Sequence, residues 1–235
     1  MTEEAIILAG GFGTRLQPLV NDVPKSMALV NARPFLEYLL DYAILQGIGR
    51  AVLSVGYKRD IIINHFRDHY KSVVIDYAIE EEPLGTGGGI RLAFWKVTGP
   101  RAIILNGDSL FRVNYSDMIA RHLKNRADAT LALRKMKNTG RYGRVAISRN
   151  NRIVDFTEKS EKVTPGYING GVYIIEKDFL MEPGFRGRFS IEKECFERYY
   201  NESRIFGYPS DGYFLDIGIP DDYKKAWHEF AKFKD

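Results

Sequence analysis

The first half of the chain alternates short apolar runs with longer amphipathic segments. Four runs have the length of buried strands: 5–9, 51–56, 73–79 and 102–106. Four segments have helical spacing of apolar residues: 34–46, 58–70, 87–96 and 116–125. Strands that alternate with helices of this length predict an α/β fold, with a mostly parallel sheet covered by helices on both faces.

The second half is richer in strands. Five runs carry Thr, Val, Ile, Tyr and Phe between Gly, Asn and Pro residues: 128–135, 142–148, 151–157, 167–175 and 204–208. Segment 220–233 predicts a closing helix. Because the chain shows no internal repeat, low-complexity segment or linker, we expect residues 1–235 to form one domain.

The first apolar run leads into a loop rich in glycine and followed by cations. After Leu8 and Ala9 the chain presents Gly10, Gly11, Gly13, Thr14, Arg15 and, further on, Lys25. Glycines allow successive backbone amides to face one anion, and the arginine and lysine add positive charge. This pattern predicts a binding site for nucleotide phosphates.

Two common phosphate-binding loops do not fit this stretch. The dinucleotide fingerprint needs a third glycine where Leu16 stands. The P-loop needs a glycine before its lysine, whereas Pro24 precedes Lys25. A dinucleotide-dependent oxidoreductase is therefore disfavoured.

Two aspartates are candidate ligands for a hard metal ion. Asp108 follows the apolar run 102–106 after a single residue, Gly107, and Asp216 follows Phe214 and Leu215. Mg²⁺ prefers one or two carboxylates together with phosphate oxygens. Either aspartate alone is equally compatible with a turn or a helix cap.

The acidic and glycine-rich segment 80–89 ends a predicted strand and opens a predicted helix. Its exposed backbone amides can approach a ligand closely. A carboxylate here, from Glu80 or Glu81, can accept from a base with adjacent N–H donors, as in guanine. Backbone groups could read the base instead, and acidic residues also suit a helix N-terminus without any ligand.

Composition narrows the class of partner. Lys and Arg exceed Asp and Glu by only four, 34 against 30, and no basic run concentrates them, so a nucleic-acid partner is not expected. No apolar run reaches the length of a membrane span. The acidic N-terminus lacks a secretory pattern, and the single cysteine, Cys195, lies in an amphipathic stretch that suits a buried thiol. We expect a cytoplasmic protein.

Taken together, the motifs resemble those of the sugar-phosphate nucleotidyltransferases. The likeness extends along the chain: GGFGTRLQPL with PK (10–25), EPLGTGG (82–88), LNGD (105–108), RYG (141–143), FTEK (156–159), INGG (168–171) and DIG (216–218). It implies a Rossmann-like mixed sheet sandwiched by helices. It also implies a nucleotide-binding half at about 1–125 and a sugar-phosphate-binding half at about 126–235.

The resemblance also implies roles for individual residues. The implied nucleotide contacts are Leu8, Ala9, Gly10, Gly11, Gly13, Thr14, Arg15, Glu80, Glu81, Pro83, Leu84, Gly85, Thr86, Asn106 and Gly107. The implied sugar-phosphate contacts are Tyr142, Gly143, Glu158, Lys159, Asn169 and Gly170. Asp108 and Asp216 would hold Mg²⁺, and catalysis would depend on Arg15, Lys25 and Asp108.

Within that family the motifs resemble those of members that transfer GMP from GTP to D-glycero-α-D-manno-heptose 1-phosphate, for bacterial surface glycans. A uridylyl-, cytidylyl- or thymidylyltransferase acting on a hexose or N-acetylmuramate 1-phosphate is the nearest alternative. A nucleotide sensor without turnover is an alternative of another class. The sequence does not reveal the oligomeric state; a homodimer is one expectation.

Overall fold

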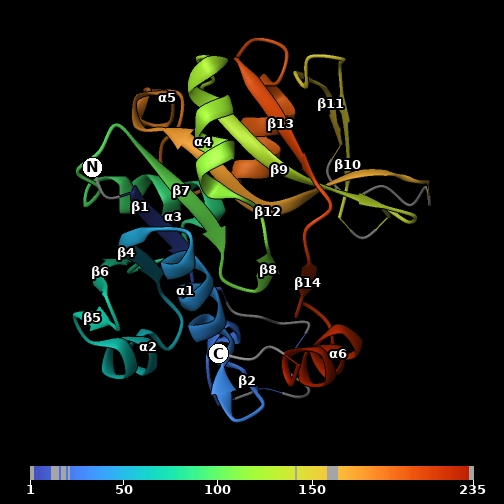
Figure 1. The fold of residues 1–235 in the computed structure, drawn as a ribbon. Helices are drawn as coiled ribbons and strands as arrows, with labels where there is room; N and C mark the ends of the chain where they lie inside the picture. The colour runs from blue at the N-terminus through green and yellow to red at the C-terminus, as the bar shows by residue number, and fades with distance from the viewer. Residues whose placement is uncertain are drawn as a thin grey trace.

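A ten-stranded mixed sheet forms the centre of the molecule (Figure 1). The computed structural model describes residues 3–11, 16, 20, 22–140, 142–157 and 164–232. The strand order is β5-β6-β4-β1-β7-β12, and β12 then pairs with both β9 and β10. β13 pairs with β9, and β11 pairs with β10. The expected α/β architecture, a mixed sheet sandwiched by helices, is confirmed.

The first four long strands are parallel. They are β1 (Glu3–Leu8), β4 (Ile48–Val55), β6 (Val73–Ile79) and β7 (Arg101–Asn106). The chain steps outward from β1 to β4 and β6, and then returns to place β7 on the other side of β1. The strand order therefore reverses between β1 and β7, and in open α/β sheets ligands bind beyond the carboxyl ends of the strands at such a point.

The second half extends this sheet with mainly antiparallel pairs. Its strands are β9 (Ala129–Met136), β10 (Arg144–Ile147), β11 (Ile153–Thr157), β12 (Gly166–Glu176) and β13 (Ile205–Ser210). β12 runs antiparallel to β7 and to β9, whereas β13 runs parallel to β9. Each of these strands lies within two residues of the expected run.

Helices cover both faces of the sheet because successive strand residues point to opposite sides. Ala5 and Ile7 face a cluster with α1, α2, α4 and α6, whereas Ile6 faces a cluster with α3, α5 and η2. The helices are α1 (Phe35–Leu45), α2 (Arg59–Phe66), α3 (Gly85–Phe94), α4 (Tyr115–Lys124), α5 (Lys177–Met181), α6 (Pro220–Phe230), the 3₁₀-helix η1 (Lys25–Met27) and the π-helix η2 (Ile191–Glu197).

The expected helix 58–70 is wrong at its C-terminal end. α2 ends at Phe66, and Arg67 then adopts a positive φ of 52°, which breaks the helix. The chain turns back as β5 (His69–Tyr70), which pairs antiparallel with β6. The pairing provides hydrogen-bond partners for backbone groups along part of the edge of β6. The helical spacing of apolar residues in the sequence does not reveal this pairing.

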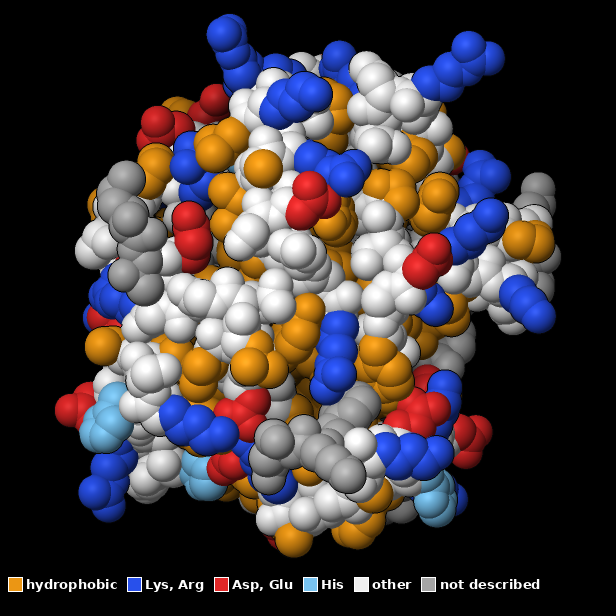
Figure 2. All heavy atoms as spheres, in the orientation of Figure 1, with side chains coloured by type: hydrophobic (Ala, Val, Ile, Leu, Met, Phe, Trp, Pro, Cys, Tyr) orange, Lys and Arg blue, Asp and Glu red, His pale blue; other side chains and the backbone are white. Residues whose placement is uncertain are grey.

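The distribution of surface charge and the burial of the single cysteine are as the sequence led us to expect. On the face shown in Figure 2, basic and acidic side chains are interspersed, without one dominant basic area. Cys195 is fully buried, and burial raises the pKa of its thiol. Within the described part of the chain, no helix combines the length and apolar character needed to cross a membrane. The cytoplasmic location and the homodimer stay predictions.

Candidate functional site

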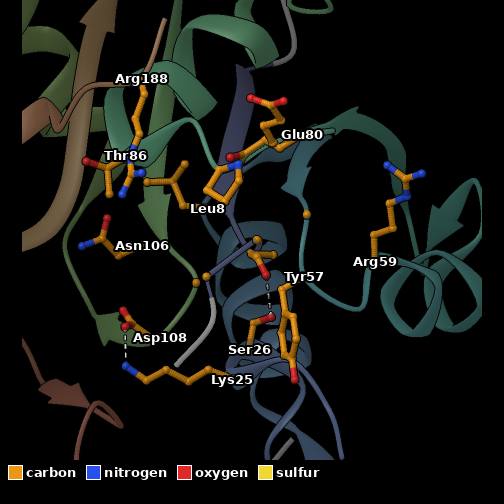
Figure 3. Close-up of a pocket in the computed structure, with 18 of the residues that line it drawn as sticks. Leu8, Lys25, Ser26, Tyr57, Arg59, Glu80, Thr86, Asn106, Asp108 and Arg188 are labelled. Atoms are coloured by element: carbon orange, nitrogen blue, oxygen red, sulfur yellow. Dashed lines mark hydrogen bonds and ion pairs between the residues drawn. The ribbon is translucent and has the colours of Figure 1, made fainter. Parts of the chain in front are cut away.

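A cavity of about 940 Å³ opens at the carboxyl ends of the parallel strands (Figure 3). Four strand ends reach it, through Ala9 after β1, Gly56 after β4, Glu80 after β6 and Asn106 at the end of β7. The full lining is Leu8, Ala9, Gly10, Gly11, Lys25, Ser26, Gly56, Tyr57, Arg59, Glu80, Glu81, Glu82, Pro83, Gly85, Thr86, Asn106, Gly107, Asp108, Arg188 and Gly218. The cavity thus lies where the strand order reverses.

Close packing at the floor of the cavity explains two of the glycines. A Cβ on Gly107 would lie 2.3 Å from the carbonyl oxygen of Leu8, and the Gly107 amide donates to that oxygen at 3.0 Å. A Cβ on Gly10 would lie 2.9 Å from the amide nitrogen of Gly56. The strand ends can approach one another only because these positions carry no side chain.

At one end of the cavity, Lys25 forms an ion pair with Asp108. Lys25 begins η1 after Pro24, and its Nζ donates to Asp108 Oδ2 at 2.5 Å (Figure 3). The lysine side chain is 10% exposed and that of Asp108 is 37% exposed. The carboxylate therefore faces the cavity more openly than the lysine that neutralises it.

The second aspartate lies beside this pair. Two short strands, β8 (Ser109–Phe111) and β14 (Phe214–Asp216), pair so that Asp216 lies opposite Ser109. The amide of Ile217 donates to the carbonyl oxygen of Asp108 at 2.9 Å. The Asp216 carboxylate accepts from the Gly218 amide at 2.5 Å.

Gly218 lies close to both Asp216 and Lys25. A Cβ on Gly218 would lie 2.7 Å from Asp216 Oδ1 and 3.2 Å from Lys25 Nζ. Gly218 lines the cavity, whereas Asp216 itself does not. The structure therefore brings Asp108, Asp216 and Lys25 together from three distant parts of the chain, as the sequence led us to expect.

Glu80 lies at the other end of the cavity and is held by two internal hydrogen bonds (Figure 3). Its Oε1 accepts from Ser54 Oγ at 2.7 Å, and its Oε2 accepts from the Leu84 amide at 3.0 Å. Leu84, expected at the nucleotide, does not line the cavity. Glu81 does, and it pairs with Arg59 at 3.0 Å.

The start of α3 differs from the expected arrangement. Its amides were expected to face a ligand, but those of Gly87 and Gly88 donate to the carbonyl oxygen of Phe189, at 3.0 and 3.4 Å. A Cβ on Gly87 would lie 2.0 Å from the Phe189 ring, and one on Gly85 would lie 2.6 Å from the Phe189 carbonyl oxygen. These glycines leave room for the segment after α5, which contains Phe189 and lies about a hundred positions further along the chain. Gly85 and Thr86 still line the cavity.

A hydrogen-bond network connects Thr86 with Asn169 through Glu192, which the sequence did not single out. Glu192 Oε2 accepts from Thr86 Oγ1 at 2.7 Å and from Ser190 Oγ at 2.8 Å. Tyr173 Oη lies 3.5 Å from Glu192 Oε1 and accepts from Asn169 Nδ2 at 2.8 Å. One carboxylate therefore links a residue expected at the nucleotide with one expected at the sugar phosphate.

The described residues expected at the sugar phosphate lie outside this cavity. Gly170 is mid-strand in β12, where a Cβ would lie 2.3 Å from the ring of Phe111, so packing alone explains this glycine. Tyr142 stacks edge-on against Phe214 with ring centroids 5.7 Å apart, and Gly143 has a φ of 76°. Tyr142 therefore lies near β14, the strand that carries Asp216.

Some expected residues lie outside the described part of the chain, and several lining residues were not expected. The former are Gly13, Thr14, Arg15, Glu158 and Lys159. The unexpected lining residues are Ser26, Gly56, Tyr57, Arg59, Glu82, Arg188 and Gly218. Gly56 ends the predicted strand 51–56 and Tyr57 follows it, so the rule that located Gly10 and Asn106 could have found them. No local pattern points to Arg188.

The chain is similar to known proteins along nearly its whole length. A family model described as nucleotidyl transferase matches residues 4–232. The chain is 45% identical over 230 residues to the D-glycero-alpha-D-manno-heptose 1-phosphate guanylyltransferase of Aneurinibacillus thermoaerophilus, covering 98% of this chain and 99% of the relative. It is 39% identical to the protein of the same name from Campylobacter jejuni, covering 94% and 96%.

A solved structure is similar along the whole fold. The structure of HddC from Yersinia pseudotuberculosis complexed with GMP-PN superposes with a TM-score of 0.85 at 34% identity. The match covers 97% of this chain and 99% of that one. The likeness therefore includes both halves of the sheet.

Proposed function

Because the chain belongs to the nucleotidyl transferase family, we propose that it transfers GMP from GTP to D-glycero-α-D-manno-heptose 1-phosphate. The products are GDP-heptose, a precursor for bacterial surface glycans, and pyrophosphate. Two relatives that match nearly the full chain carry this activity in their names. A similar structure is complexed with GMP-PN, a guanine nucleotide analogue.

The observation that carries the proposal is the pairing of Lys25 with Asp108 at one end of the cavity. Nucleotidyl transfer needs no dedicated acid or base, because an ionised sugar phosphate is already a nucleophile. It needs two polyanions held in line and charge stabilisation at the α-phosphorus. A cavity of about 940 Å³ with Lys25 and Asp108 at one end supports the proposal on both counts.

In the proposed reaction, an oxygen of the sugar phosphate attacks the α-phosphorus of GTP. A new P–O bond forms there, and the bond from that phosphorus to the β-bridging oxygen breaks to release pyrophosphate. Lys25 would donate to the α-phosphoryl oxygens, which compete with Asp108 for its Nζ. The strand-end amides at Gly10 and Gly11, with Gly13, Thr14 and Arg15, would hold the β- and γ-phosphates.

The carboxylates of Asp108 and Asp216 fit a magnesium ion. Asp216 ends β14, and Asp108 directly precedes β8, the strand that pairs with β14. Lys25 lies beside both, and Mg²⁺ is usually held by one or two carboxylates plus substrate phosphates. When bound there, Mg²⁺ would neutralise charge on the transferring phosphoryl group. Lys25 would then be released from Asp108 toward the phosphate.

We propose that the first half of the chain binds the nucleotide and the second half binds the sugar phosphate. The half at about 1–125 supplies most of the cavity, through β1, β4, β6 and β7. Tyr142, Gly143, Glu158, Lys159, Asn169 and Gly170, from 126–235, would contact the heptose phosphate. The hydrogen-bond network through Glu192 would connect the two substrate regions, because it runs from Asn169 to Thr86.

The test is a substrate panel followed by release of pyrophosphate. GTP, UTP, CTP and dTTP are each offered with heptose, mannose, glucose and N-acetylmuramate 1-phosphates, with Mg²⁺ or EDTA. We expect turnover with GTP and the heptose phosphate, and none with EDTA. Preference for another nucleotide or sugar would refute the substrate assignment. Binding of GTP without pyrophosphate release under excess of every sugar phosphate would support the sensor.

A paired set of variants tests the role of Lys25. Lys25→Ala should reduce turnover by about 10²–10³-fold, the loss expected for one preorganised charge stabiliser. Lys124→Ala, an exposed lysine at the end of α4, is the control and should retain normal turnover. Near-normal turnover by Lys25→Ala would exclude the proposed role.

A further inference from the structure

Arg188 enters the cavity from a segment that the mechanism does not use. It lies between α5 and η2, and its side chain extends into the cavity beside Thr86 and Leu8 (Figure 3). Lys25 and Asp108 lie at the opposite end of the same view. Arg188 therefore lies at the end of the cavity where Glu80 and Thr86 stand.

The backbone beside Arg188 is fastened to the start of α3. The Phe189 amide donates to the carbonyl oxygen of Leu84 at 3.0 Å, and the Phe189 carbonyl oxygen accepts from the amides of Gly87 and Gly88. The Phe189 ring fills the space left by the missing side chain of Gly87 and is 7% exposed. This anchoring fixes where the Arg188 side chain starts.

Within the described residues, no neighbour neutralises the charge of Arg188. Of the other lining cations, Lys25 pairs with Asp108 and Arg59 pairs with Glu81. Arg188 makes neither an ion pair nor a hydrogen bond with any residue that the structure describes. Its guanidinium group is therefore available to a ligand at this end of the cavity.

The chemistry of the guanidinium group selects the ligand atoms. Arginine presents only donors, in a planar fork. Guanine offers two adjacent acceptors, O6 and N7, which match that fork, whereas adenine replaces O6 with an amino donor. Uracil, cytosine and thymine have no N7. The base of a nucleotide whose phosphates lie at Lys25 would extend toward Arg188.

We propose that Arg188 reads the O6/N7 edge of the guanine base and sets the preference for GTP. The inference rests on the proposed function, which supplies the guanine nucleotide. Glu80, held by Ser54 and Leu84, stands at the same end, and a carboxylate suits the N–H donors of guanine. Arg188 would then read the adjacent O6/N7 edge.

The experiment combines variants of Arg188 with an altered base. Steady-state kinetics are measured for wild type, Arg188→Ala and Arg188→Lys with GTP, 7-deaza-GTP and ATP. Arg188→Ala should raise the KM for GTP by about 10- to 100-fold, the range expected for one bidentate base contact. The turnover number and the KM for the sugar phosphate should change little. The preference for GTP over ATP should fall.

The missing N7 provides the sharper measurement. Replacing GTP by 7-deaza-GTP should weaken binding to wild type by roughly tenfold, as expected for losing part of the two-pronged contact, and should not weaken binding to Arg188→Ala further. Arg188→Lys keeps the charge but not the fork, so it should behave like the alanine variant. Arg198→Ala, an exposed arginine near the end of η2, is the charge-matched control and should retain wild-type constants.

Two results would overturn the proposal. One is an equal penalty for 7-deaza-GTP in wild type and in Arg188→Ala. The other is an Arg188→Ala variant that raises the KM for the sugar phosphate and leaves that for GTP unchanged, with recovery in Arg188→Lys. The second pattern would assign Arg188 to a phosphate.

Direct binding separates this inference from the proposed reaction. If wild type fails to turn over GTP with heptose 1-phosphate, the proposed function fails. Calorimetric titration of wild type and Arg188→Ala with GMP and 7-deaza-GMP then still tests Arg188. If 7-deaza-GMP binds more weakly than GMP to wild type but not to Arg188→Ala, Arg188 reads the base. If the two ligands bind wild type equally, the proposal is refuted.

Discussion

Replacing Gly107 by alanine should damage both stability and activity, because the added methyl group meets backbone atoms. The new Cβ would lie 2.3 Å from the carbonyl oxygen of Leu8 and 3.1 Å from its carbonyl carbon. Side-chain Cβ atoms essentially never come closer than 3.0 Å, so the strand ends must separate by about 0.7 Å. β1 and β7 are central strands with buried residues on both faces, and they have little freedom to separate.

The magnitude follows from two effects. Forcing one extra methyl group into a well-packed region costs about 1–3 kcal/mol of unfolding free energy. For a chain of this size that is a fall of about 2–12 °C in Tm. The separation also moves Asp108, the next residue, relative to the floor of the cavity. A displacement approaching 1 Å at a reacting group can reduce kcat/KM by about 10²-fold.

Thermal melts and pyrophosphate release measure the two effects separately. Gly11→Ala is the control for stability, because a Cβ at that glycine would have nothing within 4 Å, and its Tm should stay within about 2 °C of wild type, as for a surface substitution. Activity of Gly107→Ala is measured well below its own Tm, so that unfolding does not contribute. A Gly107→Ala variant with both wild-type Tm and wild-type kcat/KM would show that the contact between β1 and β7 is not rigid.

Four further results are expected. Burial alone would raise the pKa of Glu4, but donors from Gly99, Thr98 and Arg50 outweigh it, and the pKa lies below its ordinary value of 4.5. Glu4→Gln should therefore lower the unfolding free energy by about 2 kcal/mol at pH 7, and chemical denaturation should show the difference shrinking as the pH falls through the folded-state pKa. Glu192→Gln should raise the KM for both substrates, since the hydroxyl donors of both subsites lose a shared carboxylate; a change in only one KM would argue against coupling. Asp216→Asn should raise the Mg²⁺ concentration for half-maximal activity by about tenfold or more, and an unchanged Mg²⁺ titration would remove Asp216 from the metal site. Cys195, fully buried, should react with a thiol reagent only after unfolding, and rapid labelling of the native protein would contradict its burial.

Local patterns sufficed for the long strands, for most of the long helices and for part of the cavity, but not for the short elements β5, β8, β14, α5 and η2. An apolar run of strand length that ends in glycine or a carboxylate identifies a strand end, and parallel strand ends share one edge of a sheet. Hence the sequence alone could assign Gly10, Glu80, Asn106 and Asp108 to one site, and all four line the cavity.

Other features depend on contacts between distant segments. The end of α2 at Phe66 follows from the pairing of β5 with β6, although the spacing of apolar residues continues beyond it. The glycines of α3 suggested amides open to a ligand, yet Phe189 occupies them. Propensity and periodicity describe a residue's neighbours along the chain, whereas these outcomes depend on neighbours in space.

The chain alone thus determined the α/β class, the strand ends and the chemical types gathered at the site. Only the tertiary structure decided that β8 and β14 pair so that Asp108 and Asp216 lie beside Lys25. It alone brought Arg188 and Glu192 to the start of α3. The physical reason is that conformational propensity and the spacing of apolar residues depend on neighbours along the chain, whereas the segment that pairs with a strand edge or packs against a glycine comes from a distant part of the sequence.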